Sequence, residues 1–182
     1  GKRVPGNSAI FNFTPIDIIK DLQIGDLISI DFNSALVQVI AQKTEGVNMR
    51  DLNGGQVGPN KAVTVERNLV LPALTSKDVA AIKIARNLGL SNFALSFANN
   101  SSDVKLFKKL TGGHATIISK IESLAGLNDL EAIAELANAL LIDRGDLSRQ
   151  VPLEQIPEVQ KTIIKIGKMR HKEVFVATNL LE

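Results

Sequence analysis

Residues 115–122 read ATIISKIE, a run of largely β-branched residues that ends in a lysine and a glutamate. Such a run is typical of a buried β-strand. A segment with helical character precedes it at residues 101–110, with Gly112 and Gly113 supplying a turn, and another follows at residues 127–138. The stretch therefore predicts a strand that lies between two helices, as in a βαβ unit.

The alternation of helix and strand extends in both directions from this stretch. The spacing of Thr75 and Asp78 matches a capping box, which predicts a helix that ends near Leu88, before Gly89. Further elements are predicted as strands at residues 93–97, 140–143 and 174–178 and as a helix at residues 153–171. Strands that alternate with helices predict a parallel sheet with right-handed crossovers. The predicted strand ends lie about 24, 24 and 34 residues apart, close to the roughly 31 residues per unit of an eight-unit βα barrel.

The residues before Pro72 follow a different pattern, because short apolar stretches alternate there with turn residues. Two strands that pair as a hairpin are predicted at residues 27–30 and 35–41. Turns and a further short strand are predicted at residues 53–55, 58–60 and 62–65. We therefore divide the chain into a β domain of residues 1–71 and an α/β domain of residues 72–182.

The composition excludes several classes of function. The 182 residues include 21 Lys and Arg against 19 Asp and Glu, a net charge of +2 that does not predict a nucleic-acid-binding surface. The chain has no Cys, and so neither a disulfide nor a thiolate metal site. No run approaches the roughly 18 apolar residues that span a membrane, and the first residues do not resemble a signal peptide. We expect a cytoplasmic protein with no nucleic-acid or membrane partner.

Charged residues gather where the predicted strands end, at the edge where parallel sheets carry their functional groups. Lys120 and Glu122 are two residues apart in a strand and therefore project from the same face. The next two predicted strands lead into residues 143–146, which read DRGD, and into Thr178. Because the carboxyl ends of parallel strands meet at one edge, we expect these side chains to lie close together.

Glu122 and Asp146 offer hard oxygen ligands from neighbouring strand ends, which is the donor type that Mg²⁺ or Mn²⁺ prefers. Lys120 and Arg144 could neutralise negative charge that develops on an enolate or on a transferred phosphoryl group. The alternative is a set of ordinary ion pairs at the rim of the sheet. The residues therefore predict a divalent-metal site, with this alternative left open.

Five blocks of the sequence resemble the pyruvate kinase family, and they occur in the family's order and at its spacing. The blocks are LPALTSKD at 71–78, ALSF at 94–97, ISKIE at 118–122, RGDL at 144–147 and ATNLLE at 177–182. Residues 25–31 and 53–61 are similar to the later part of the family's β lid domain.

The resemblance implies an α/β fold, namely part of a (β/α)8 TIM barrel with an inserted small β-barrel lid domain. Residues 1–71 would be part of the lid domain, and residues 72–182 would supply barrel strands four to seven with the metal and substrate site. The first three strands, the eighth strand and the family's regulatory domain would lie outside this chain, as would the residues that contact K⁺ and the nucleotide phosphates. The resemblance also implies a homo-oligomer.

The resemblance further implies an activity, the transfer of a phosphoryl group from phosphoenolpyruvate to ADP, which gives pyruvate and ATP in glycolysis. Glu122 and Asp146 would hold Mg²⁺ or Mn²⁺. Lys120 and Arg144 would act on the transferred group, and Thr178 would supply a hydroxyl near the proton-transfer path. The substrate would contact Gly145, Asp146, Thr178 and Ser96.

Seven residues depart from the family pattern: Phe32, Asn33, Asn99, Asp143, Ser148, Gln150 and Asn179. Asp143 adds a negative charge beside Arg144 that could retune the metal site or compete for the metal. The departures leave two alternatives open. One is a metal-dependent 2-keto-acid lyase or aldolase of related barrel type, and the other is a noncatalytic pyruvate kinase-like paralogue.

Overall fold

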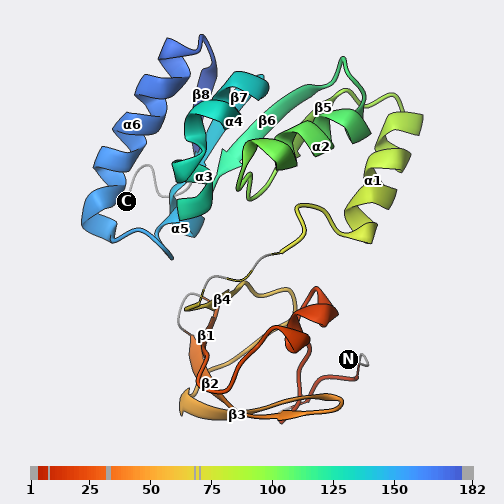
Figure 1. The fold of residues 1–182 in the computed structure, drawn as a ribbon, viewed down its shortest axis with the longest axis vertical. Helices are drawn as coiled ribbons and strands as arrows, with labels where there is room; N and C mark the ends of the chain where they lie inside the picture. The colour runs from red at the N-terminus through yellow and green to blue at the C-terminus, as the bar shows by residue number, and fades with distance from the viewer. Residues whose placement is uncertain (1–3, 8, 32–33, 68, 70, 178–182) are drawn as a thin grey trace. The chain divides into compact units, whose positions relative to one another are not determined.

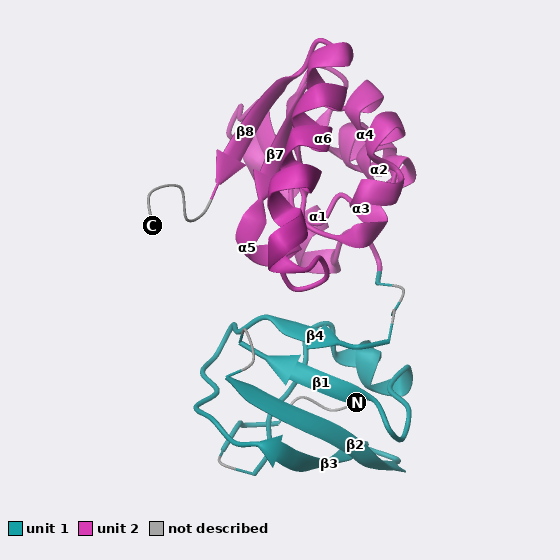
Figure 2. Ribbon diagram, turned by 90° about the vertical axis from the view of Figure 1, so that its left-hand side faces the viewer, with its two compact units in different colours: residues 1–71 teal, residues 72–182 magenta. Residues whose placement is uncertain are grey.

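The computed structural model describes residues 4–7, 9–31, 34–67, 69 and 71–177. The chain divides into two compact units, Gly1–Leu71 and Pro72–Glu182, which are drawn in different colours in Figure 2. Several residues that the sequence singled out lie outside the described ranges, namely Phe32, Asn33, Thr178 and Asn179. Among the helices that the structure describes, none is both long and apolar enough to cross a membrane.

The first unit contains an antiparallel sheet with the strand order β3-β2-β1-β4. Its elements are the 3-10 helix η1 (Ile16–Lys20) and the strands β1 (Leu27–Ile30), β2 (Ala35–Lys43), β3 (Gly46–Asn53) and β4 (Val63–Val65). β1 pairs with β2, with Ile30 opposite Ala35, so the predicted hairpin is confirmed. The apolar core of this unit is formed by Phe13, Leu22, Ile28, Ile30, Ala35, Val37 and Val39.

β3 is a strand that the sequence pattern did not predict. Most of its side chains are exposed, so its residues lack the strict alternation of a half-buried strand. The turn that joins it to β2 consists of Thr44 and Glu45, without the Asn-Gly or Gly-containing pair that usually marks a two-residue hairpin. Pairing along the length of β2, with Lys43 opposite Gly46, stabilises this strand instead.

The second unit contains a parallel sheet whose described strands lie in the order β5-β6-β7-β8 (Figure 1). The strands are β5 (Asn92–Leu95), β6 (Thr116–Ile121), β7 (Ala139–Asp143) and β8 (Glu173–Ala177). The order in space equals the order in the chain, as expected when each crossover adds a strand beside the previous one. The predicted parallel sheet is therefore confirmed, and the fold class is α/β. The described strands do not by themselves close the eight-stranded barrel that the resemblance implies.

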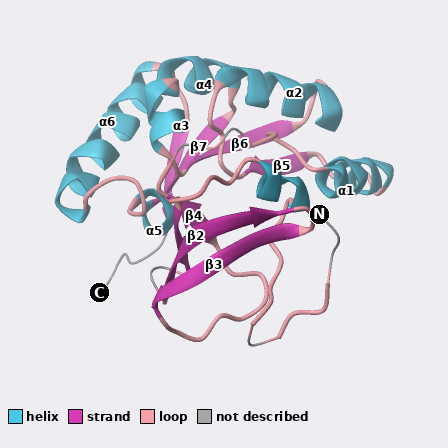
Figure 3. Cartoon of the chain, turned by 60° about the horizontal axis from the view of Figure 1, so that its bottom comes forward, coloured by secondary structure: helices cyan, strands magenta, loops and turns pink. Residues whose placement is uncertain are grey.

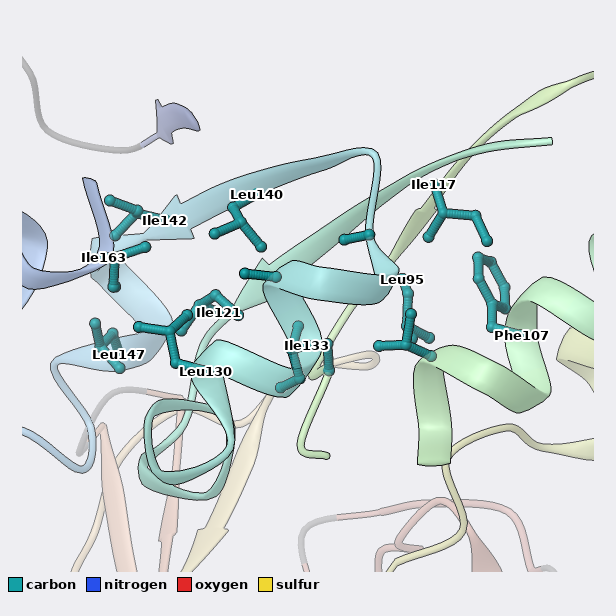
Figure 4. Packing of buried hydrophobic residues seen from close by; sticks show 14 of the residues in the cluster. Leu95, Phe107, Ile117, Ile121, Leu130, Ile133, Leu140, Ile142, Leu147 and Ile163 are labelled. Atoms are coloured by element: carbon teal, nitrogen blue, oxygen red, sulfur yellow. The ribbon is translucent and has the colours of Figure 1, made fainter. Parts of the chain in front are cut away.

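Helices α2, α4 and α6 cover one face of this sheet (Figure 3). The helices of the unit are α1 (Ser76–Asn87), α2 (Ser101–Thr111), α3 (Leu124–Asn128), α4 (Leu130–Leu136), α5 (Arg144–Leu147) and α6 (Ile156–Met169), with the 3-10 helix η2 (Leu153–Gln155) before α6. Side chains of the central strands form a buried cluster with residues of all three covering helices. It includes Ile117, Ile121, Leu140 and Ile142 from the strands and Phe107, Ile133 and Ile163 from the helices (Figure 4). Burial of such side chains contributes about 1.5–3 kcal/mol each.

Two helix predictions are corrected by the structure. The helix predicted over residues 127–138 is divided into α3 and α4 at Asp129, whose carboxylate accepts the Ser101 N–H at 2.6 Å and so caps the start of α2. The helix predicted over residues 153–171 starts as η2, and α6 begins only at Ile156, beside Pro157 in its first turn. The one-turn helix α5 was not predicted, because four residues are too few for a periodic pattern.

The capping box of α1 is formed as predicted and gives a first test. The Thr75 hydroxyl accepts the Asp78 N–H at 3.2 Å, and the Asp78 carboxylate accepts the Thr75 N–H at 2.8 Å. Replacing Thr75 by Ala is expected to lower the free energy of unfolding by about 1 kcal/mol at pH 7. The hydrogen bonds from Thr75 also lower the pKa of Asp78, so their contribution is present above pH 4 or so and is lost as the pH falls through the lowered value.

Urea unfolding followed by helical circular dichroism, at pH 7 and at pH 2.5, measures this effect. The matched control is Thr162→Ala, because the exposed Thr162 hydroxyl donates to the Glu158 carbonyl within α6 and caps no helix. A Thr75→Ala variant that unfolds like this control at pH 7 would refute the assigned role of the capping box.

Candidate metal centre

Three carboxylates meet where β6 and β7 end. Glu122 directly follows β6, Asp143 is the last residue of β7, and Asp146 lies in α5. One carboxylate oxygen of each residue lies within 4.8 Å of the others. The Glu122 side chain is only 1% exposed, whereas Asp143 and Asp146 are partly buried. Three hard oxygen donors from three separate positions form a set that suits Mg²⁺ or Mn²⁺.

Lys120 places a positive charge against this cluster. Its Nζ atom lies 2.5 Å from Glu122 Oε1 and 3.4 Å from Asp143 Oδ2. Burial of the side chain lowers the pKa of Lys120, but contact with the Glu122 and Asp143 carboxylates outweighs burial and raises it above its ordinary value. Lys120 is therefore a fixed cation, and the sequence prediction that Lys120 and Glu122 share one face agrees with this contact.

The protonation of Glu122 is set by opposing influences. Burial raises the pKa of its carboxyl group, while the Lys120 ammonium and a hydrogen bond from the backbone of Phe97 act against burial. The nearby Asp146 carboxylate adds to the rise. Oxygen Oε1 is buried and is paired with the Lys120 ammonium.

The turn that follows β5 holds the other oxygen of Glu122. The Phe97 N–H donates to Glu122 Oε2 at 2.6 Å. Phe97 has a φ of 49°, the left-handed region that residues other than Gly seldom adopt. The sequence could not reveal this contact, because any residue type can supply a backbone N–H. The left-handed conformation was also hidden, because Phe97 is not one of the residue types, such as Gly or Asn, that usually mark it.

The segment after β7 is compact and carries Asp146. The Asp143 side chain caps α5 by accepting the Asp146 N–H at 3.4 Å, and Arg149 Nη2 lies 3.4 Å from Asp146 Oδ1. The Ser148 hydroxyl donates to the Gly145 carbonyl at 2.7 Å. Asp143, which the sequence presented as a departure from the family, is thus a member of the carboxylate cluster.

The structure brings some predicted site residues together and leaves others apart. Lys120, Glu122 and Asp146 lie in or against the cluster, as described above. Arg144 and Gly145 form the start of α5 and are partly buried. Ser96 is exposed in the turn after β5, and Thr178 lies outside the described residues.

The fold and the site together define a parallel α/β protein with a carboxylate cluster and a lysine at the carboxyl end of its sheet. The family described as "Pyruvate kinase, barrel domain" matches residues 3–182. The chain is 33% identical over 169 residues to a pyruvate kinase of Mycobacterium tuberculosis, a match that covers 91% of the chain and 36% of that relative. It is 32% identical over 185 residues to a pyruvate kinase of Thermotoga maritima, covering 100% of the chain and 40% of that relative.

A pyruvate kinase of Aeropyrum pernix is 32% identical over 175 residues, covering 92% of the chain and 38% of that relative. The chain belongs to the pyruvate kinase family. It spans well under half the length of these three relatives.

Proposed function

We propose that the chain carries the metal-binding and phosphoryl-transfer part of a pyruvate kinase active site. The reaction is transfer of the phosphoryl group of phosphoenolpyruvate to ADP, which gives pyruvate and ATP. The observation that supports it is the lysine held against three carboxylates at the ends of β6 and β7. The substrates are proposed from the relatives of the chain, which are named pyruvate kinases.

Glu122 and Asp146 are proposed as ligands of Mg²⁺ or Mn²⁺, and the cluster adds Asp143 as a third oxygen donor. When bound, the cation would orient the substrate oxygens and reduce their negative charge. The carboxylates of Asp143 and Glu122 lie close together and repel each other. Lys120 contacts both of them and partly offsets this repulsion.

Lys120 is proposed to stabilise the phosphoryl group during transfer. Its side chain is 21% exposed, and its ammonium contacts the Glu122 and Asp143 carboxylates. A fixed positive charge of this kind needs no reorganisation when negative charge develops beside it. Arg144 is proposed as a second cation near the substrate, and Thr178 as the hydroxyl near the proton-transfer path. Gly145, Asp146 and Ser96 are proposed to contact the substrate.

Calorimetry with Mn²⁺, with and without oxalate as an analogue of the enolate, tests this function. Mn²⁺ is expected to bind the purified chain, and oxalate is expected to tighten its binding by about tenfold, because both ligands share the site. Circular dichroism of the same sample establishes that the chain is folded. A folded chain that binds no Mn²⁺ would contradict the proposal and favour the noncatalytic paralogue.

A further inference from the structure

Asn99, one of the departures from the family pattern, links the turn after β5 to the start of α3. Its Oδ1 accepts a hydrogen bond from the Ser123 hydroxyl at 2.5 Å. The same hydroxyl accepts the Gly126 N–H at 3.1 Å, which is one of the unsatisfied donors at a helix start. The side chains of Asn99 and Ser123 and the Gly126 N–H are thus linked by two consecutive hydrogen bonds, which the burial of Ser123 shields from water.

Gln150, a second departure, makes the equivalent link from the turn after α5. Its Oε1 accepts the Leu124 N–H at 2.8 Å, another of the donors at the start of α3. Gln150 lies in the turn that continues from α5, the helix that carries Asp146. The two departures therefore tie the segments that follow β5 and β7 to the same short helix.

Gly126 lets the turn after β5 approach α3 closely. A Cβ atom at this position would lie 2.6 Å from the Ala98 carbonyl oxygen, a distance that no side chain can adopt. Ala98 is fully buried, and its N–H donates to the Lys120 carbonyl at 3.2 Å. The turn is thus held at two neighbouring residues: Ala98 is bonded to β6, and Asn99 is bonded to Ser123 at the start of α3.

From these contacts we propose that Asn99 and Gln150 are positioning residues for the carboxylate cluster. Asn99 holds the turn in which Phe97 keeps its left-handed conformation and directs its N–H at Glu122. Gln150 holds the segment that carries Asp146. The inference rests on the proposed function only where it concerns the metal, because the positions of Phe97 and Glu122 can be measured without one.

Amide hydrogen exchange of Phe97 in the metal-free chain tests the positioning directly. Asn99→Ala is expected to speed exchange of this amide by about tenfold, and Asn99→Asp, which keeps an acceptor for Ser123, is expected to restore protection. The matched control is Asn138→Ala, since Asn138 Oδ1 accepts the Ile117 N–H at 2.9 Å at the opposite end of the sheet. Unchanged protection of Phe97 in Asn99→Ala would overturn the inference.

Mn²⁺ affinity provides the second measurement. Asn99→Ala, Gln150→Ala and Gly126→Ala are each expected to weaken binding by about tenfold, the lower end of the effect of removing a group that orients a ligand. Asn138→Ala is expected to retain the wild-type affinity at a comparable loss of stability. Equal affinity in all four variants would overturn the inference. A wild-type chain that binds no Mn²⁺ but protects Phe97 through Asn99 would refute the proposed function alone and leave the positioning role in place.

Discussion

Replacing Glu122 by Gln is expected to weaken Mn²⁺ binding by about 100-fold, because the variant loses the charge of one of the proposed ligands, and Glu122 is the most deeply buried of them. The fold is expected to persist at reduced stability, since Gln has the same shape and can still accept the Phe97 N–H, while Lys120 loses its contact with Glu122 and keeps the one with Asp143. Calorimetry with Mn²⁺ measures the change.

The matched control for this variant is Glu131→Gln. Glu131 pairs with Arg170 at 3.2 Å, and its side chain is 70% exposed, so the same substitution breaks an ion pair away from the cluster. Mn²⁺ affinity should not change in the control. If Glu122→Gln bound Mn²⁺ as tightly as the wild type while folded, the cluster would be a set of structural ion pairs.

Replacing Lys120 by Met is expected to lower the free energy of unfolding of the metal-free chain by about 3–5 kcal/mol. The substitution leaves Glu122 buried without its cation and leaves the Glu122 and Asp143 charges to repel each other. Mn²⁺ is expected to bind the variant at least as tightly as the wild type, because the cation takes over the role of the ammonium. At 100 times its dissociation constant, Mn²⁺ would restore about 2.7 kcal/mol.

Urea unfolding with and without Mn²⁺ measures both effects. Arg170→Met serves as the control, since it removes a cation from an exposed pair and should cost no more than about 1 kcal/mol. A Lys120→Met variant as stable as this control would show that the Lys120 contacts are weak. A variant that lost Mn²⁺ binding would show that Lys120 supports the metal ligands and does not merely balance their charge.

The parts of the fold with strong local signals could be predicted from the sequence. The β-branched run at β6 and the capping box of α1 depend on neighbouring residues, so their patterns are visible without the tertiary structure. Lys120 and Glu122 were placed on one face by the two-residue period of a strand. The metal role of Glu122 and Asp146 remains a prediction.

The features that sequence could not reveal depend on contacts between distant residues. At the break between α3 and α4, the Asp129 carboxylate accepts the N–H of Ser101, which lies 28 residues earlier in the chain. β3 forms because β2 pairs along it, and the Phe97 N–H reaches Glu122 only when two strands lie side by side. In the sequence, Asn99 and Gln150 are only departures from a family pattern. In the structure, their side chains accept hydrogen bonds from Ser123 and Leu124 at the start of α3.

The agreement between chain order and spatial order in β5-β6-β7-β8 also bears on how the protein folds. The Phe97 contact with Glu122 spans 25 residues of chain, and each later strand adds beside the one already formed. Loops of this length close at a modest entropic cost. During synthesis, the carboxylate cluster can therefore assemble once α5 has left the ribosome and while β8 is still inside it, so that folding of the site precedes completion of the sheet.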